Sequence, residues 1–176
     1  MVNHLSWSPS GRLLAAGLGD GSASVFSVEN RSFVEVARLQ EVGHETAVAS
    51  VLFPSFLPTT SQHVASQDRL LVTLRNDAVI NFWDLGSSAA GEGAVNPFSS
   101  LAPEAEQNDV KNNRNLDNAM EDLSLFGDQP RLIFGIPHHE KPNWMTSSRG
   151  LDPLFPSSLF VADISNDITA YSIPLR

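Results

Sequence analysis

The stretch that decides the fold runs from residue 70 to residue 84 and reads LLVTLRNDAVINFWD. An apolar run typical of a buried strand breaks at Asn76-Asp77, where turn-forming residues meet, and a second apolar run follows and ends in Trp83-Asp84. Upstream lies Gly43-His44. A Gly-His pair about 40 residues before a Trp-Asp pair is typical of one four-stranded blade of a β-propeller. Residues 41–86 are therefore predicted to form such a blade.

The same pattern occurs twice more in the chain. Residues 13–27 read LLAAGLGDGSASVFS and align without a gap, which brings Asp20 to the place of Asp77. Residues 159–172 read LFVADISNDITAYS, and Tyr171 stands there in the place of the tryptophan. Self-similarity at this period indicates repeated structural modules.

The repeats predict an all-β chain. We expect a partial β-propeller of about three four-stranded antiparallel blades, belonging to a seven-bladed ring. The expected units are a complete blade over 1–40, a blade with the Gly-His and Trp-Asp pairs over 41–86, and a terminal blade without its outer strand over 130–176. Residues 87–129 are rich in Ser, Asn, Gly and acidic residues, so they are expected to be a disordered acidic insert that buries too little apolar surface to order. The fourth strand of the second blade is expected to resume at 131–135.

Composition narrows the classes of function. The 176 residues carry a formal net charge of −9, which argues against nucleic-acid binding because phosphate contacts need clustered Lys and Arg. The absence of cysteine excludes disulfides and thiol catalysis. The N-terminus does not read as a signal peptide, and no apolar stretch approaches the roughly 20 residues of a membrane span. We expect a cytoplasmic or nuclear protein, and, because three blades cannot close a ring, a truncated form of a longer one.

The paired marks and their repetition resemble the WD-repeat (WD40) family. Three C-terminal runs, HEKPNW at 139–144, LFVAD at 159–163 and ITAYSIPL at 168–175, are similar to the end of one member of that family. The resemblance implies a non-catalytic scaffold that binds other proteins and needs no cofactor. Its narrower implication is a substrate receptor of a cullin-4 ubiquitin ligase, bound through the ligase adaptor. The Trp-Asp-x-Arg mark of such receptors is incomplete at 83–86, which reads WDLG.

The resemblance also implies a structural tetrad made of His44, Thr73, Asp77 and Trp83. In the family pattern the indole N–H donates to the hydroxyl, the hydroxyl to the imidazole, and the imidazole to the carboxylate in the turn. A catalytic interpretation of the same His, Asp and Thr is disfavoured because the indole occupies the hydroxyl. The first repeat keeps only Asp20 of this set, so no complete tetrad is expected there.

The third repeat is the most divergent. It has Tyr171 and Ser165 at two tetrad places, so we expect it to depend on apolar packing. His138-His139-Glu140 admits two interpretations: metal ligands of a metal-dependent hydrolase, or a degenerate Gly-His mark. The second is favoured because no further group of ligands completes a tetrahedral site in the sequence.

One further motif lies in the acidic segment. Four apolar residues at helical spacing predict a short amphipathic helix that binds a partner, with an unstructured apolar patch as the alternative. They are Leu116, Met120, Leu123 and Phe126.

Overall fold

The computed structural model describes residues 1–29, 31–55, 68–86, 129–148 and 157–172. The strands in these ranges are β1 (Val2–Trp7), β2 (Leu13–Leu18), β3 (Ala23–Glu29), β4 (Ser32–Leu39), β5 (Val48–Leu52), β6 (Leu70–Arg75), β7 (Val79–Asp84), β8 (Arg131–Pro137), β9 (Pro142–Ser148), β10 (Ser158–Asp163) and β11 (Ile168–Ser172). Within the same ranges, no helix is long and apolar enough to cross a membrane.

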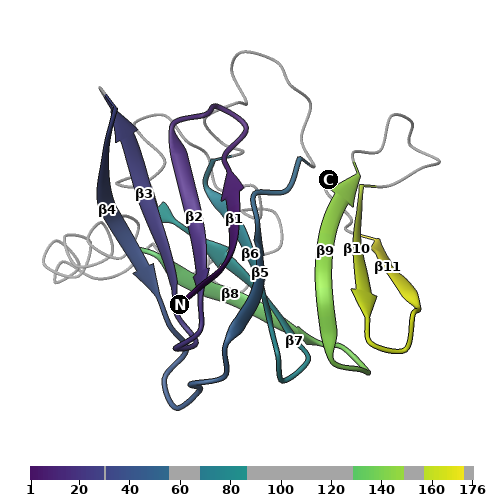
Figure 1. The fold of residues 1–176 in the computed structure, drawn as a ribbon. Coiled ribbons are helices and arrows are strands. Elements are labelled where there is room, and N and C mark those ends of the chain that lie inside the picture. The colour runs from purple at the N-terminus through teal and green to yellow at the C-terminus, as the bar shows by residue number, and fades with distance from the viewer. Residues whose placement is uncertain (30, 56–67, 87–128, 149–156, 173–176) are drawn as a thin grey trace, which may run out of the picture.

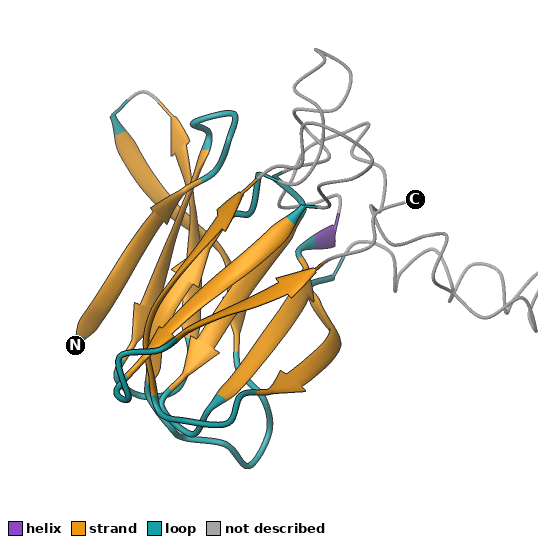
Figure 2. Ribbon diagram, turned by 90° about the vertical axis from the view of Figure 1, so that its right-hand side faces the viewer, coloured by secondary structure: helices purple, strands orange, loops and turns teal. Residues whose placement is uncertain are grey.

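The strands form three antiparallel sheets that stand side by side (Figure 1). Their strand orders are β1-β2-β3-β4, β5-β6-β7-β8 and β11-β10-β9. Connecting loops gather at the two ends of the stacked strands (Figure 2). The all-β prediction of propeller-like blades is confirmed at this level.

The second sheet is closed by a strand that is distant in sequence. β8 pairs with β7, from Val79 opposite Pro137 to Asp84 opposite Arg131. The unit expected over 130–176 thus begins with a strand of the second sheet, and the third sheet begins at Pro142. The acidic segment, apart from residue 129, and the four apolar residues of the predicted helix lie outside the described residues.

The three sheets share one hairpin geometry. In each, the residue three positions after the end of the second strand donates its N–H to the carbonyl of that strand's last residue, over 3.1–3.4 Å. These donors are Gly21, Ala78 and Asn166, with φ of 86°, 65° and 68°. All three lie in the left-handed region, as a three-residue hairpin loop with a bulge requires. The gap-free alignment of the three repeats therefore holds at the level of the backbone.

The second sheet is buried on both faces. All six residues of β6 are buried, and successive side chains point to opposite faces. Leu71 and Trp83 pack toward the first sheet, in a cluster with Val25 and Val51. On the other face, a second cluster joins Leu70, Val72, Leu74, Ile80 and Phe82 to Met145, Leu159 and Val161 of the third sheet.

Polar side chains of β1 fix the boundary between the first two sheets. They hydrogen-bond to the backbone around β5. Asn3 Nδ2 donates to Val48 O over 3.0 Å, and His4 Nδ1 lies 3.0 Å from Val51 O. Ser6 Oγ accepts from Phe53 N over 3.2 Å. Because each bond satisfies a backbone group on the inner strand of the next sheet, β1 and β5 are held in one register.

Gly17 is required for this close approach. A Cβ added at Gly17 would lie 2.9 Å from Val48 Cγ1 and 3.1 Å from Val51 Cγ1. Since both valines are buried and stiff at χ1, Gly17→Ala should lower the free energy of unfolding by about 1–3 kcal/mol. Urea denaturation followed by far-UV circular dichroism measures the loss. Gly19→Ala is the matched control, because its added Cβ would meet no atom nearer than 3.6 Å. Equal unfolding midpoints for the two variants would contradict the packing described here.

Candidate functional site: polar networks and an uncovered sheet face

Trp83 and Thr73 are brought together between the first two sheets. They lie on adjacent strands and share the face of the second sheet that points to the first. Trp83 Nε1 donates to Thr73 Oγ1 over 2.9 Å, and both residues are buried. The Thr73 hydroxyl therefore accepts the hydrogen bond of the N–H of a buried indole.

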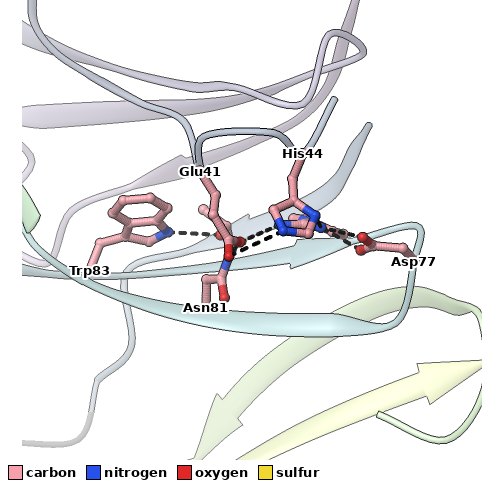
Figure 3. A network of polar contacts seen from close by, with 7 residues as sticks. Glu41, His44, Asp77, Asn81 and Trp83 are labelled. Atoms are coloured by element: carbon pink, nitrogen blue, oxygen red, sulfur yellow. Dashed lines mark hydrogen bonds and ion pairs between the residues drawn. The ribbon is translucent and has the colours of Figure 1, made fainter. Parts of the chain in front are cut away.

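His44 and Asp77 are linked through a residue that the sequence analysis missed. His44 Nδ1 lies 2.9 Å from Arg75 Nη2, and the ring nitrogen accepts because a guanidinium only donates. Arg75 also donates to Asp77, through Nε at 3.0 Å and through Nη2. Among the described residues, His44 makes no hydrogen bond to Thr73 or Asp77. This is a correction to the expected tetrad, and its cause is the buried Arg75 side chain, which hydrogen-bonds to both His44 and Asp77. Figure 3 shows His44 with Glu41 and Asp77 in this network.

Glu41 completes this network from the loop before β5. It accepts from Arg75 Nη1 and from Asn81 Nδ2, the latter over 3.2 Å, and its other oxygen lies 3.6 Å from His44 Nε2. The Arg75 side chain is only 3% exposed, so its charge needs these anionic partners. The signal for it in the sequence was an arginine at the end of a mostly apolar strand, two residues before the turn aspartate.

In the first sheet, Asp20 belongs to a smaller, solvent-facing network. Its Oδ1 accepts from Ser22 N (3.0 Å) and Ser22 Oγ (2.7 Å), and its Oδ2 accepts from Arg38 Nη2 (2.8 Å). The hydrogen bonds from Ser22, followed by the positive charge of Arg38, hold the pKa of Asp20 below its usual value. Asp20 therefore stabilises its own turn, without an indole or an imidazole.

The third sheet contains a polar cluster in addition to the apolar packing that joins it to the second sheet. Tyr171 OH and His138 Nδ1 are 2.7 Å apart, and His138 Nε2 lies 3.3 Å from Asp163 Oδ2. Asp163 Oδ1 accepts from Ser165 N (2.9 Å) and Ser165 Oγ (2.5 Å). His139 Nε2 approaches Asp163 Oδ2 to 3.4 Å, whereas Glu140 is exposed.

Two pKa values in this cluster are displaced. Hydrogen bonds from Ser165 lower the pKa of Asp163, although burial acts in the opposite direction. Burial and the negative charge of Asp163 raise the pKa of Tyr171. The carboxylate is thus held ionised and the phenol protonated at neutral pH.

Asp84, the acid of the Trp-Asp pair, has a structural role. It is buried and accepts from Arg69 through Nε and through Nη2, the latter over 2.9 Å. Its Oδ1 also accepts from Gly86 N over 3.0 Å. These bonds fix the end of β7 where β6 begins.

Among the described residues, the first sheet exposes apolar side chains on the face that points away from the second sheet. The strand register places Trp7 opposite Leu14 and Leu14 opposite Phe26. Since directly opposed residues share a face, these three lie on the side away from the core cluster that joins the first two sheets. Trp7 is 53% exposed, and Leu5, two residues earlier on the same face, is 54% exposed. Single exposed apolar residues are ordinary, but a contiguous row on a sheet face marks an interaction surface.

Comparisons with known proteins agree with this architecture. Residues 1–52, which contain the first sheet and β5, match the family model described as Anaphase-promoting complex subunit 4 WD40 domain. No curated protein matches the chain.

Two solved structures of Sqt1 are similar to this chain. Sqt1 from Chaetomium thermophilum gives a TM-score of 0.59 at 21% identity, over 98% of this chain and 34% of that one. Sqt1 from Saccharomyces cerevisiae gives 0.57 at 13% identity, over 99% of this chain and 32% of that one. The chain thus spans about a third of the length of either Sqt1 chain. At these identities the likeness shows the fold, a partial β-propeller, and the family match is confined to residues 1–52.

Proposed function

We propose that this chain is a non-catalytic propeller scaffold that binds other proteins. The observation that carries the proposal is the uncovered apolar face of the first sheet, on which Leu5 and Trp7 are more than half exposed. The polar network of the second sheet serves as internal bracing. The Thr73 hydroxyl is occupied by an indole and Arg75 is enclosed by carboxylates, so neither is presented to a substrate.

The finer proposals rest on sequence resemblance. The runs at 139–144 and 159–163 support a homologue of the C-terminal blades of WD repeat-containing protein 53, acting in the cytoplasm or the nucleus. The cullin-4 receptor function has no support in the described part of the chain. Gly86 stands where the receptor mark has arginine, and Asp84 is buried against Arg69.

The scaffold proposal is tested by changing the uncovered face. Leu5→Ser with Trp7→Ser should remove most cross-links between the chain and its protein partners, because both side chains leave the contact surface while the core cluster is untouched. Cross-linking mass spectrometry of the tagged chain in cells measures this, with cross-linked peptides mapped to β1 and β2.

The matched control uses the outer strand of the same sheet. Phe33 and Val34 of β4 are also exposed, at 57% and 59%, so Phe33→Ser with Val34→Ser removes a similar apolar area elsewhere. We expect this variant to keep the partners. If both variants kept every partner, or lost the same ones, the assignment of binding to the β1 face would be wrong.

The bracing role of Thr73 is tested by a double-mutant cycle. Thr73→Val keeps the shape but leaves the Trp83 N–H buried without an acceptor, so it should lower the free energy of unfolding by about 1–3 kcal/mol. In a Trp83→Phe background, with no N–H to satisfy, the same change should cost less than about 0.5 kcal/mol. Equal costs in the two backgrounds, measured by urea denaturation, would show that the hydroxyl has another role.

Arg75 should contribute far more to the free energy of unfolding than the exposed Arg38 does. Arg75→Met keeps the alkyl stem but leaves both Glu41 and Asp77 without their shared cation, which should cost about 2–3 kcal/mol. Arg38→Met is the control, since Arg38 and Asp20 are both more than half exposed and such pairs contribute little. Thermal unfolding measures both, and a smaller loss for Arg75→Met than for Arg38→Met would refute the role of Arg75.

A further inference from the structure

Two imidazoles and one carboxylate converge beside the third sheet. His138 and His139 lie in the loop between β8 and β9, and Asp163 is the last residue of β10. His138 Nε2 and His139 Nε2 lie 3.3 Å and 3.4 Å from Asp163 Oδ2. The three donor atoms all lie within 4.8 Å of one another. Elements separated in sequence thus direct three metal-ligating groups at one point.

Two of these donor atoms are buried without a hydrogen-bond partner. The side chains of His138 and Asp163 are 0% exposed. In the described part of the chain, His138 Nε2 and Asp163 Oδ2 take part in no hydrogen bond, so their 3.3 Å approach lacks hydrogen-bond alignment. The other atom of each group is already used, His138 Nδ1 by Tyr171 and Asp163 Oδ1 by Ser165. A buried polar atom without a partner is unfavourable, so a ligand shared by these two atoms would stabilise the chain.

The second sheet shows which charges surround the position that is equivalent to Asp163. Arg75 ends β6 as Asp163 ends β10, and the same hairpin turn follows each residue. In the second sheet the Arg75 guanidinium is the cation between His44 and its acidic neighbours Glu41 and Asp77. In the third sheet the equivalent residue is an anion, and among the described residues no Lys or Arg pairs with Asp163. The histidines there face a negative charge, and the position of the cation is open.

We propose that His138 Nε2, His139 Nε2 and Asp163 Oδ2 bind one divalent transition-metal ion of the zinc class. Ligands about 2.0–2.1 Å from a tetrahedral zinc lie about 3.3 Å from one another, which matches the two measured separations. Imidazole nitrogen with carboxylate oxygen favours zinc over calcium or magnesium. A metal-bound His138 would donate its Nδ1–H to Tyr171 OH, the kind of outer hydrogen bond that orients a ligating histidine.

The site is reachable from solvent on one side. The His139 side chain is 56% exposed, so an ion can arrive over it and a water molecule can complete the coordination. The structure therefore corrects the metal interpretation of His138-His139-Glu140 in one respect. Asp163, from β10, takes the place of Glu140, which is exposed and outside the cluster.

The test is equilibrium dialysis of the full chain, first stripped with a chelator, against zinc chloride, with bound zinc counted by mass spectrometry. The unchanged chain should bind about one ion and melt at a higher temperature with zinc than without it. His139→Ala should lose the ion, and because this side chain is exposed, its metal-free melting temperature should equal that of the unchanged chain. Glu140→Gln, the matched control, should bind as the unchanged chain does. Tyr171→Phe should weaken binding about tenfold or more.

The outcomes that would overturn the proposal are specific. They are the absence of stoichiometric zinc on the unchanged chain, stoichiometric zinc that survives His139→Ala, or loss of zinc in Glu140→Gln. The first would mean that a proton on His138, and not a metal, satisfies Asp163. None of them bears on the scaffold proposal, which rests on the opposite side of the molecule, at β1 and β2.

Discussion

Successive side chains of β6 and β7 point to opposite faces of the second sheet, and each face is covered by a neighbouring sheet. A slip by one residue would exchange Thr73 and Trp83 with Val72 and Phe82, and so place a polar pair in a wholly apolar cluster. The register is fixed by the turn in which Ala78 adopts a left-handed conformation. The hydrogen bonds of the network and the contacts between sheets are both consequences of that one alignment.

The fold could be predicted from the sequence because its signals are local. Turn residues and the repeat period located the central hairpin of each sheet, since these signals depend on neighbours only a few positions away. The remote pairing of β8 with β7 was accessible because the second module lacked one strand of its four. The polar segment between these strands carries no such pattern, and the predicted helix from Leu116 to Phe126 stays a prediction.

The candidate sites were predictable only where the family pattern holds. The contact between Trp83 and Thr73 follows from residues that match the pattern. The role of Arg75 does not follow from the pattern, because the family pattern covers the tetrad positions and not the last residue of the second strand. That neglected position holds a cation in the second module and an anion, Asp163, in the third. Its chemistry depends on which loop side chains reach it, and loop side-chain placement is a tertiary property.

The long sequence separation between β7 and β8 affects how the fold tolerates insertions between these two strands. The chain leaves the second sheet at Asp84 and returns at Arg131 to complete it. Closure entropy grows only with the logarithm of loop length, by about 0.6 kcal/mol for each doubling. Added length between Asp84 and Arg131 therefore costs little closure entropy. An engineer seeking a place to graft a reporter has there a junction where the size of the insertion matters little for loop closure.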